Sequence, residues 1–182
     1  FKPKPEYAML RSLVGSEMCI RDRFEAVSTF FQMYRDVAAE EWGYEASGKQ
    51  LGWAVPIYVA ESDEIAQKEA RPHIEAFYNK FLRMTNEMLL PPGYTTISSM
   101  KKIAEAKREM LSGGREMKRL METRMFICGS PNTVREILEE CQEKTNLEHL
   151  VCTLQFGTLP HSLTVKNLEM FATEVAPHFR LA

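Results

Sequence analysis

The sequence lacks long hydrophobic runs and any large excess of charge of one sign. Its 182 residues carry 23 Lys+Arg against 25 Asp+Glu, a formal net charge of −2, which argues against a strongly basic nucleic-acid-binding protein. No apolar stretch approaches the roughly 18 residues that a membrane span requires, and charges interrupt the N-terminal segment where a signal peptide would be apolar. We therefore expect a cytoplasmic globular protein with neither a nucleic-acid nor a membrane partner.

Motifs for metals and nucleotides are missing as well. The four cysteines, Cys19, Cys128, Cys141 and Cys152, are scattered without a Cys-x-x-Cys pair, and no histidine has zinc spacing. There is no Gly-rich nucleotide loop and no nucleophile elbow. We predict no metal site, and we interpret the cysteines as small hydrophobic side chains in a reducing compartment.

The first 23 residues show neither helical nor strand periodicity. Within them, the ten residues Leu13–Asp22 resemble the translation of an adapter that is ligated to DNA in sequencing libraries. This resemblance predicts that residues 1–23 are not native, that the native segment begins near Phe24, and that the protein has been cut on its N-terminal side. A genuine N-terminal extension is the alternative.

From Phe24 onward, helices and strands alternate. Hydrophobic residues at three- and four-residue spacings predict an amphipathic helix over Phe24–Trp42, and Gly43 stands where a helix stop belongs. The apolar run Leu51–Ala60 predicts a strand covered on both faces, although Pro56 removes one ladder donor. Ser62 is expected to cap a helix that ends near Met84 and buries one side, formed by Ile65, Ala66, Ala70, Ile74, Phe77 and Phe81.

Two further strand–helix units follow. Met125–Cys128 predicts a short strand, and Ser130 is the expected cap of a helix with a buried stripe of Val134, Ile137, Leu138 and Cys141. Leu150–Gln155 predicts a third strand, before a last helix whose expected buried face is Leu168, Phe171, Ala172, Val175 and Phe179. Strand–helix units in series imply parallel pairing, so the predicted fold class is α/β.

A long excursion, residues 85–124, separates the first unit from the second. Pro91, Pro92 and Gly93 interrupt the chain there, and Lys101–Met110 predicts a charged helix. Long connections of this kind are commonly lids or substrate walls, so we interpret the excursion as an insertion that covers a site.

Ligands of parallel α/β proteins bind where strands end and helices begin. At Gly129 and Ser130, free backbone N–H groups and the helix dipole can hold a phosphate, with a simple N-cap role for Ser130 as the alternative. No residue in this part of the sequence decides between the two.

A second group of candidate residues follows the third strand. Gln155 can donate and accept hydrogen bonds, Phe156 can cover a planar ring, and Gly157 lies in the same loop. His161 can transfer a proton near neutral pH, although a loop histidine bonded to backbone is the plainer interpretation. Residue chemistry alone therefore does not determine the function.

Three stretches resemble the luciferase-like flavin monooxygenase family: Leu51–Ala60 with Ser62-Asp63-Glu64, Ile127–Arg135, and Leu154–His161 leading into Val175–Arg180. Residues 24–182 fit the C-terminal half of such a protein. The resemblance implies a TIM barrel that uses reduced flavin (FMNH2) and O2 to oxygenate a small organic substrate, with a separate flavin reductase as partner. It also makes His161 the candidate catalytic residue and implies flavin contacts for Gly129, Ser130, Gln155, Phe156 and Gly157.

The sequence departs from that family in extent. A complete barrel has eight strands and about 250 residues, whereas three strands are predicted here, so the barrel is incomplete. We expect exposed edges and a fragment that is inactive alone and prone to aggregate. Two alternatives stay open: a deazaflavin- or nicotinamide-linked oxidoreductase on the same barrel, and a non-catalytic subunit that stabilises a partner in a homo- or heterodimer.

Overall fold

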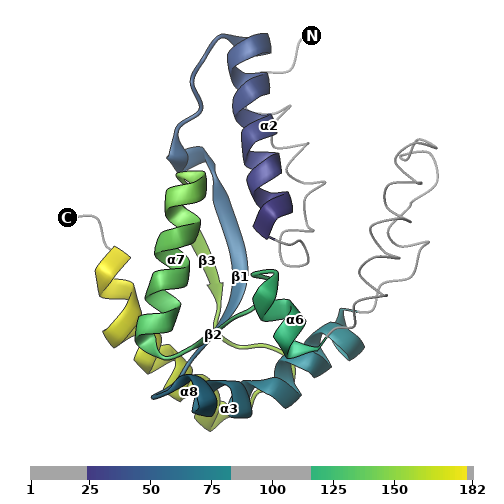
Figure 1. Ribbon diagram of the computed structural model, residues 1–182, viewed down its shortest axis with the longest axis vertical. Helices are drawn as coiled ribbons and strands as arrows, with labels where there is room; N and C mark the ends of the chain where they lie inside the picture. The colour runs from purple at the N-terminus through teal and green to yellow at the C-terminus, as the bar shows by residue number, and fades with distance from the viewer. Residues whose placement is uncertain (1–23, 83–115, 180–182) are drawn as a thin grey trace.

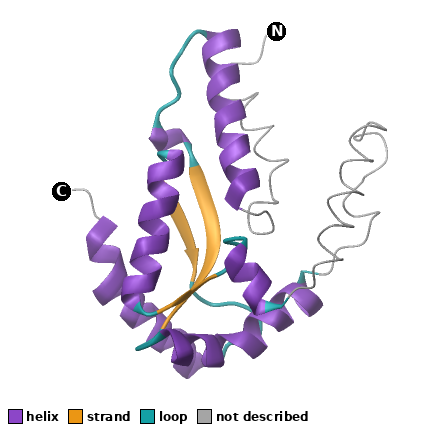
Figure 2. Cartoon of the chain, viewed as in Figure 1, coloured by secondary structure: helices purple, strands orange, loops and turns teal. Residues whose placement is uncertain are grey.

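The computed structural model describes residues 24–82 and 116–179. The adapter-like segment Leu13–Asp22, Cys19, most of the excursion and the expected helix Lys101–Met110 lie outside the described residues. The described part is a small parallel sheet with helices on both of its faces, which confirms the α/β class (Figure 1; Figure 2). Among the described residues, no helix has the length and apolar character needed to cross a membrane.

The sheet has three strands in the order β2-β1-β3. Strand β1 (Gly52–Val59) pairs in parallel with β3 (His149–Thr153) through residues 52–56, and with β2 (Ile127–Gly129) through residues 57–59. The parallel pairing confirms the sequence prediction. The order differs from that of a TIM barrel, in which each strand lies beside its sequence neighbours: here β2 and β3 lie on opposite edges of β1.

Pro56 does not interrupt β1. Backbone groups of successive strand residues point alternately to the two neighbouring strands. The N–H of Ala60 donates to the carbonyl oxygen of Gly129 at 3.2 Å, so even-numbered residues face β2. The nitrogen of Pro56 therefore points to a side where pairing begins only at Ile57, and its missing N–H removes no bond of the ladder.

Helix α2 (Phe24–Trp42) has the bounds that the spacing predicts, and it ends at Gly43, whose φ of +68° suits a glycine stop. Helix α3 (Asp63–Ala76) continues into a π-helical turn, η2 (Phe77–Phe81). Ser62 Oγ accepts a hydrogen bond from the N–H of Ile65 at 3.3 Å, which confirms Ser62 as the cap of α3.

The remaining helices are α6 (Met117–Glu122), α7 (Pro131–Thr145) and α8 (His161–Met170). Single turns complete the described part: η1 (Gly48–Gln50), η3 (Phe171–Val175) and η4 (Ala176–Phe179). Ser130 caps α7, whose expected stripe is confirmed with Val134, Leu138 and Cys141 buried and Ile137 packed beside them.

Two predicted helix faces were partly wrong. In α3 the buried row is Ala66, Ala70 and Ile74, continued by Tyr78, whereas Ile65 and Phe81 are exposed because they lie off this four-residue spacing. In α8 and the turn after it, Leu168 and Ala172 are exposed, whereas Val175 is buried as expected. Phe171 and Phe179 also pack against the core as predicted, whereas the buried position of α8 itself is Asn167 instead of the predicted Leu168.

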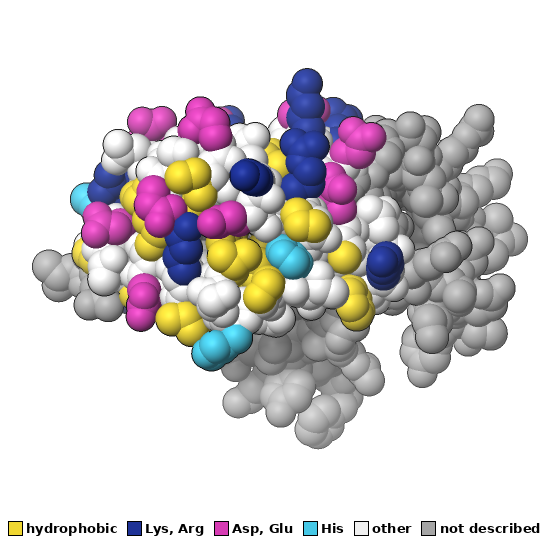
Figure 3. Space-filling model, turned by 90° about the horizontal axis from the view of Figure 1, so that it is seen from below, with side chains coloured by type: hydrophobic (Ala, Val, Ile, Leu, Met, Phe, Trp, Pro, Cys, Tyr) yellow, Lys and Arg dark blue, Asp and Glu magenta, His cyan; other side chains and the backbone are white. Residues whose placement is uncertain are grey.

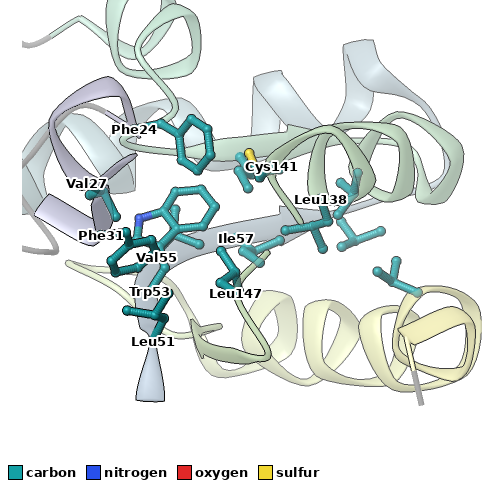
Figure 4. Packing of buried hydrophobic residues seen from close by; sticks show 14 residues of the cluster. Phe24, Val27, Phe31, Leu51, Trp53, Val55, Ile57, Leu138, Cys141 and Leu147 are labelled. Atoms are coloured by element: carbon teal, nitrogen blue, oxygen red, sulfur yellow. The ribbon is translucent and has the colours of Figure 1, made fainter. Parts of the chain in front are cut away.

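Hydrophobic cores lie on both faces of β1. Trp53, Val55, Ile57 and Val59 face α2 and α7, where the rings of Phe24 and Trp53 have centroids 5.0 Å apart (Figure 4). The even-numbered Tyr58 and Ala60 face α3 and α6. The carboxyl half of β1 is therefore covered on both sides, as its apolar run predicts.

The cysteines of the described residues are free thiols. Cys128 and Cys141 are buried and Cys152 is partly buried. Burial raises the pKa of Cys141 to about 12 and that of Cys152 to about 11, so both stay protonated and unreactive at neutral pH. This agrees with their interpretation as small hydrophobic side chains.

The amide of Asn167 continues the sheet where β3 stops. Asn167 is fully buried, and its Oδ1 accepts the N–H of Val59 at 2.8 Å. Its Nδ2 donates to the carbonyl oxygens of Ile57 at 2.8 Å and Leu154 at 2.9 Å. One side chain therefore satisfies two buried backbone groups and one partly buried group that would otherwise have no partner strand.

Replacing Asn167 with alanine leaves these three groups without partners. We expect Asn167→Ala to lower the free energy of unfolding by about 3 kcal/mol or more, because each unsatisfied buried group costs about 1–3 kcal/mol. Urea unfolding of the full chain measures the change. The matched control is Leu168→Ala, at the neighbouring exposed position, for which a change within about 0.5 kcal/mol is expected. Equal effects of the two substitutions would show that the hydrogen bonds of the Asn167 amide do not contribute to the free energy of unfolding.

Candidate functional site at the carboxyl ends of the strands

The three strands end on the same side of the sheet, at the bottom of Figure 1, where α3 and α8 lie across them. The first two strand–helix junctions meet there. The N–H of Ala60, after β1, donates to the carbonyl oxygen of Gly129 at the end of β2. The structure thus brings Gly129 and Ser130 next to the start of α3.

A carboxylate of the chain itself occupies the start of α7. Asp63 Oδ1 accepts the N–H of Ser130 at 2.6 Å, and Asp63 Oδ2 accepts the hydroxyl of Thr133 at 3.1 Å. The hydrogen bond from the Ser130 N–H holds the pKa of Asp63 below its ordinary value, against the opposing effect of burial. The site at which the sequence predicts a phosphate therefore contains an internal anion.

Gly129 allows this close approach. A Cβ at position 129 would lie 2.7 Å from Asp63 Oδ1 and 2.9 Å from the Cβ of Thr133. Any side chain would displace the carboxylate or the first turn of α7. The Gly-Ser-Pro segment thus has a structural explanation in this chain, the junction of α3 with α7.

The third junction is packed against α3. Phe156 is buried, with its ring edge-on to Tyr58 and Phe126 at centroid distances of 6.3 Å and 5.4 Å. Gly157 has a φ of +55°, and a Cβ there would lie 2.3 Å from the carbonyl oxygen of His73. His73 Nδ1 also contacts the hydroxyl of Thr158 at 2.8 Å. The loop after β3 is therefore fixed to α3 over several successive residues.

The residues predicted to contact flavin thus differ in what they touch and in how exposed they are. Gly129 and Ser130 meet a carboxylate, and Phe156 and Gly157 belong to the packing between the loop and α3. Gln155 and His161 are exposed. The described residues, as arranged, do not fit a flavin phosphate at the start of α7 or a flavin ring against Phe156, because each place is filled by the chain's own groups.

Sequence reasoning missed a polar cluster at the same end of the sheet. The hydroxyl of the fully buried Tyr58 donates to Glu69 Oε2 at 2.9 Å. Lys166 Nζ lies 3.1 Å and 3.0 Å from the two oxygens of Glu69 and 2.7 Å from Glu61 Oε2. The cluster joins β1, α3 and α8, and it extends from the core to the surface.

The protonation states follow from these contacts. Burial, and then the bond to Glu69, raises the pKa of Tyr58, so the phenol stays protonated. Burial by itself would lower the pKa of Lys166, but the hydrogen bonds to Glu61 and Glu69 outweigh it and raise the pKa. Lys166 is therefore a cation at neutral pH that clamps α3 to α8. Only the eight-residue spacing of the two glutamates hints at this cluster in the sequence, and nothing local indicates their partner.

Seen from below, the face formed by this end of the molecule mixes basic, acidic and hydrophobic side chains without a field of one sign (Figure 3). A pocket of about 290 Å³ lies elsewhere, between α2, α6 and α7. None of the site residues predicted from sequence lines it; its lining is Phe24, Glu25, Arg119, Glu122, Thr123, Arg124, Glu140, Cys141 and Lys144.

Replacing Asp63 with asparagine removes the anion at the start of α7 and keeps the shape of the side chain. At pH 7 we expect a loss of about 1 kcal/mol in the free energy of unfolding, a small value because the carboxylate is partly exposed. Since folding lowers the pKa of Asp63, this loss is complete above the unfolded pKa of about 3.9 and disappears as the pH falls through the lower folded pKa.

Urea unfolding of both proteins from pH 7 to pH 3 measures this dependence. The control is Glu64→Gln, which removes a charge from the same first turn at an exposed position. A loss that stays constant over this pH range would contradict the electrostatic role of Asp63.

No protein-family model and no curated protein sequence matches the chain. The solved structures that share its fold include two monooxygenases. Monooxygenase RslO1 from Streptomyces bottropensis aligns with a TM-score of 0.55 and 16% identity, over 88% of this chain and 40% of its own. The oxygenating constituent of 3,6-diketocamphane monooxygenase from the CAM plasmid of Pseudomonas putida, a type II Baeyer-Villiger monooxygenase in complex with FMN, aligns with a TM-score of 0.58 and 20% identity, over 88% of this chain and 42% of its own. This chain therefore spans about two fifths of the length of either protein and is similar to both in fold.

Proposed function

We propose that the chain is part of a flavin-dependent monooxygenase that uses reduced flavin and O2 on a small organic substrate. The observation that carries this proposal is the fold shared with two monooxygenases, one of them in complex with FMN. The sequence resemblance at Ile127–Arg135 and Leu154–His161 supports it independently. Because the chain spans about two fifths of either enzyme, the proposal includes residues that this chain does not contain.

We infer roles for this chain's own residues from their positions and from the sequence resemblance. A reduced flavin, delivered by a separate reductase, would supply the activation of O2 when bound. Gln155 and His161 are exposed beside the end of β3 and can meet a ligand, with His161 as the group that transfers a proton. The excursion 85–124 serves as the lid that excludes water. Gly129 and Ser130 are given no flavin contact in this proposal, because the carboxylate of Asp63 occupies the start of α7.

The chain alone is expected to be inactive and to bind flavin weakly. FMN fluorescence titrated with the purified full chain should show no saturable change at micromolar protein concentrations, because Asp63 repels a phosphate at α7 and Phe156 is buried. The comparison is Asp63→Asn, which removes that repulsion and should bind inorganic phosphate and FMN better than the parent chain. Saturable, tight binding of FMN by the unmodified chain would overturn this expectation.

An enzyme of the proposed kind that contains this chain tests the function itself. It should consume O2 only when reduced flavin and an organic substrate are both present. The substrate panel includes ketones, the class that a Baeyer-Villiger monooxygenase oxygenates. His161→Ala should lower turnover about 100-fold with an unchanged unfolding midpoint, as expected for loss of a proton-transfer group.

His149→Ala is the matched control, since His149 is exposed at the opposite end of β3. Its turnover should equal that of the parent enzyme. Hydride transfer from a nicotinamide or a deazaflavin without O2 uptake would replace the proposal with the alternative oxidoreductase. A protein without flavin that copurifies with a complete barrel would replace it with the non-catalytic subunit.

A further inference from the structure

Helix α2 carries a second apolar row beside the one that it buries. The core row is Phe24, Val27, Phe31 and Ala38. The second row has heptad-like spacing and lies about 120° away around the helix, with Phe30 46% and Met33 56% exposed; its members are Ala26, Phe30, Met33 and Val37. This stripe is about 16 Å long, and contiguous exposed apolar surface of this kind marks interaction sites.

Acidic side chains border the stripe. Asp36 and Glu40 lie on its side away from the core, by the helical spacing of 100° per residue, and both are exposed. Asp36 Oδ1 accepts a hydrogen bond from Gln32 Nε2 at 2.7 Å, which leaves its charge without a cation among the described residues. The single basic residue of α2 is Arg35, whose guanidinium donates to the carbonyl oxygen of Thr145 and so points toward α7. None of the ion pairs between described residues includes an acidic residue of α2.

The end of α2 adds to this negative charge. Its last turn contains no basic residue, although Glu40 and Glu41 stand beside the negative end of the helix dipole. Acidic residues at a helix C-terminus are unfavourable in isolation, and a cation from outside relieves them. The stripe therefore lies beside negative charge that the described part of the chain leaves without a cationic partner.

We propose that the α2 stripe binds a helix of a partner protein whose own apolar face is bordered by Lys and Arg side chains. Phe30 and Met33 fill the spaces between that helix's apolar residues, and its basic side chains meet Asp36 and Glu40. A second copy of this chain fits poorly, because two α2 helices face to face place acidic residues against acidic residues. The proposal is independent of the flavin chemistry.

Two synthetic peptides of 18 residues test this with the purified full chain. Both have leucine at heptad a and d positions and are helical; one has lysine at the bordering positions and the other glutamate. By fluorescence anisotropy, the lysine peptide should bind with micromolar affinity, at least tenfold more tightly than the glutamate peptide, and more weakly at 300 mM than at 50 mM salt.

Variants of the stripe sharpen the test. Phe30→Ser with Met33→Ser should weaken binding of the lysine peptide at least tenfold. Leu168→Ser is the matched control, because Leu168 on α8 is also 46% exposed, and it should change nothing. Asp36→Lys with Glu40→Lys should reverse the preference toward the glutamate peptide. Unfolding curves of all variants establish that each still folds.

Three results would overturn the proposal. The first is equal affinity for both peptides, the second is absence of binding, and the third is an unchanged affinity in the double serine variant. Sedimentation equilibrium supplies a separate check. A dimer of this chain that the double serine variant abolishes would assign the stripe to a second copy instead of a basic partner helix.

Discussion

The carboxyl half of β1 depends on the side chain of Asn167, because β3 ends at Thr153 whereas β1 continues to Val59. A strand buried on both faces cannot leave its edge groups without partners, since water does not reach them. The amide donates and accepts along the strand as a neighbouring backbone would. It also binds the carbonyl oxygen of Leu154, so the same contact that completes the sheet fixes the first residue of the loop after β3. Helix α8, β1 and that loop are thus coupled through one residue.

Internal contacts fill the side of the sheet where parallel α/β proteins usually hold ligands. Asp63 takes the donors at the start of α7, and Lys166 is shared between Glu61 and Glu69. Phe156 and Gly157 pack the loop between β3 and α8 against α3. These contacts have one helix in common, because each of them joins α3 or the residues just before it to another element. They hold the described part together around α3, and they leave Gln155 and His161 as the exposed members of the predicted site.

The sequence predicts the features that local chemistry controls. The bounds of α2, the glycine stop at Gly43 and the caps Ser62 and Ser130 each depend on a few neighbouring residues, and all four are confirmed. Periodicity selected Leu168 instead of Asn167 as the buried position of α8 because it counts apolar residues, whereas that position belongs to an amide that pairs with a distant strand. The strand order and the bond between Asp63 and Ser130 join residues far apart in the chain, so no local pattern contains them. The same holds for the clamp of Lys166 on two glutamates.

The two outer strands differ in how completely they are covered. β2 is buried throughout, whereas Val151 in the middle of β3 is 60% exposed opposite the half-buried Ala54. β3 is also the last strand of the described sheet on that side, so its outer backbone groups face no further strand of the described residues. A strand added at this edge would pair those backbone groups, whereas Val151 projects from a face of the sheet and would be buried only by an element packed on that face. The described sheet is therefore less completely covered at its β3 edge than at its β2 edge.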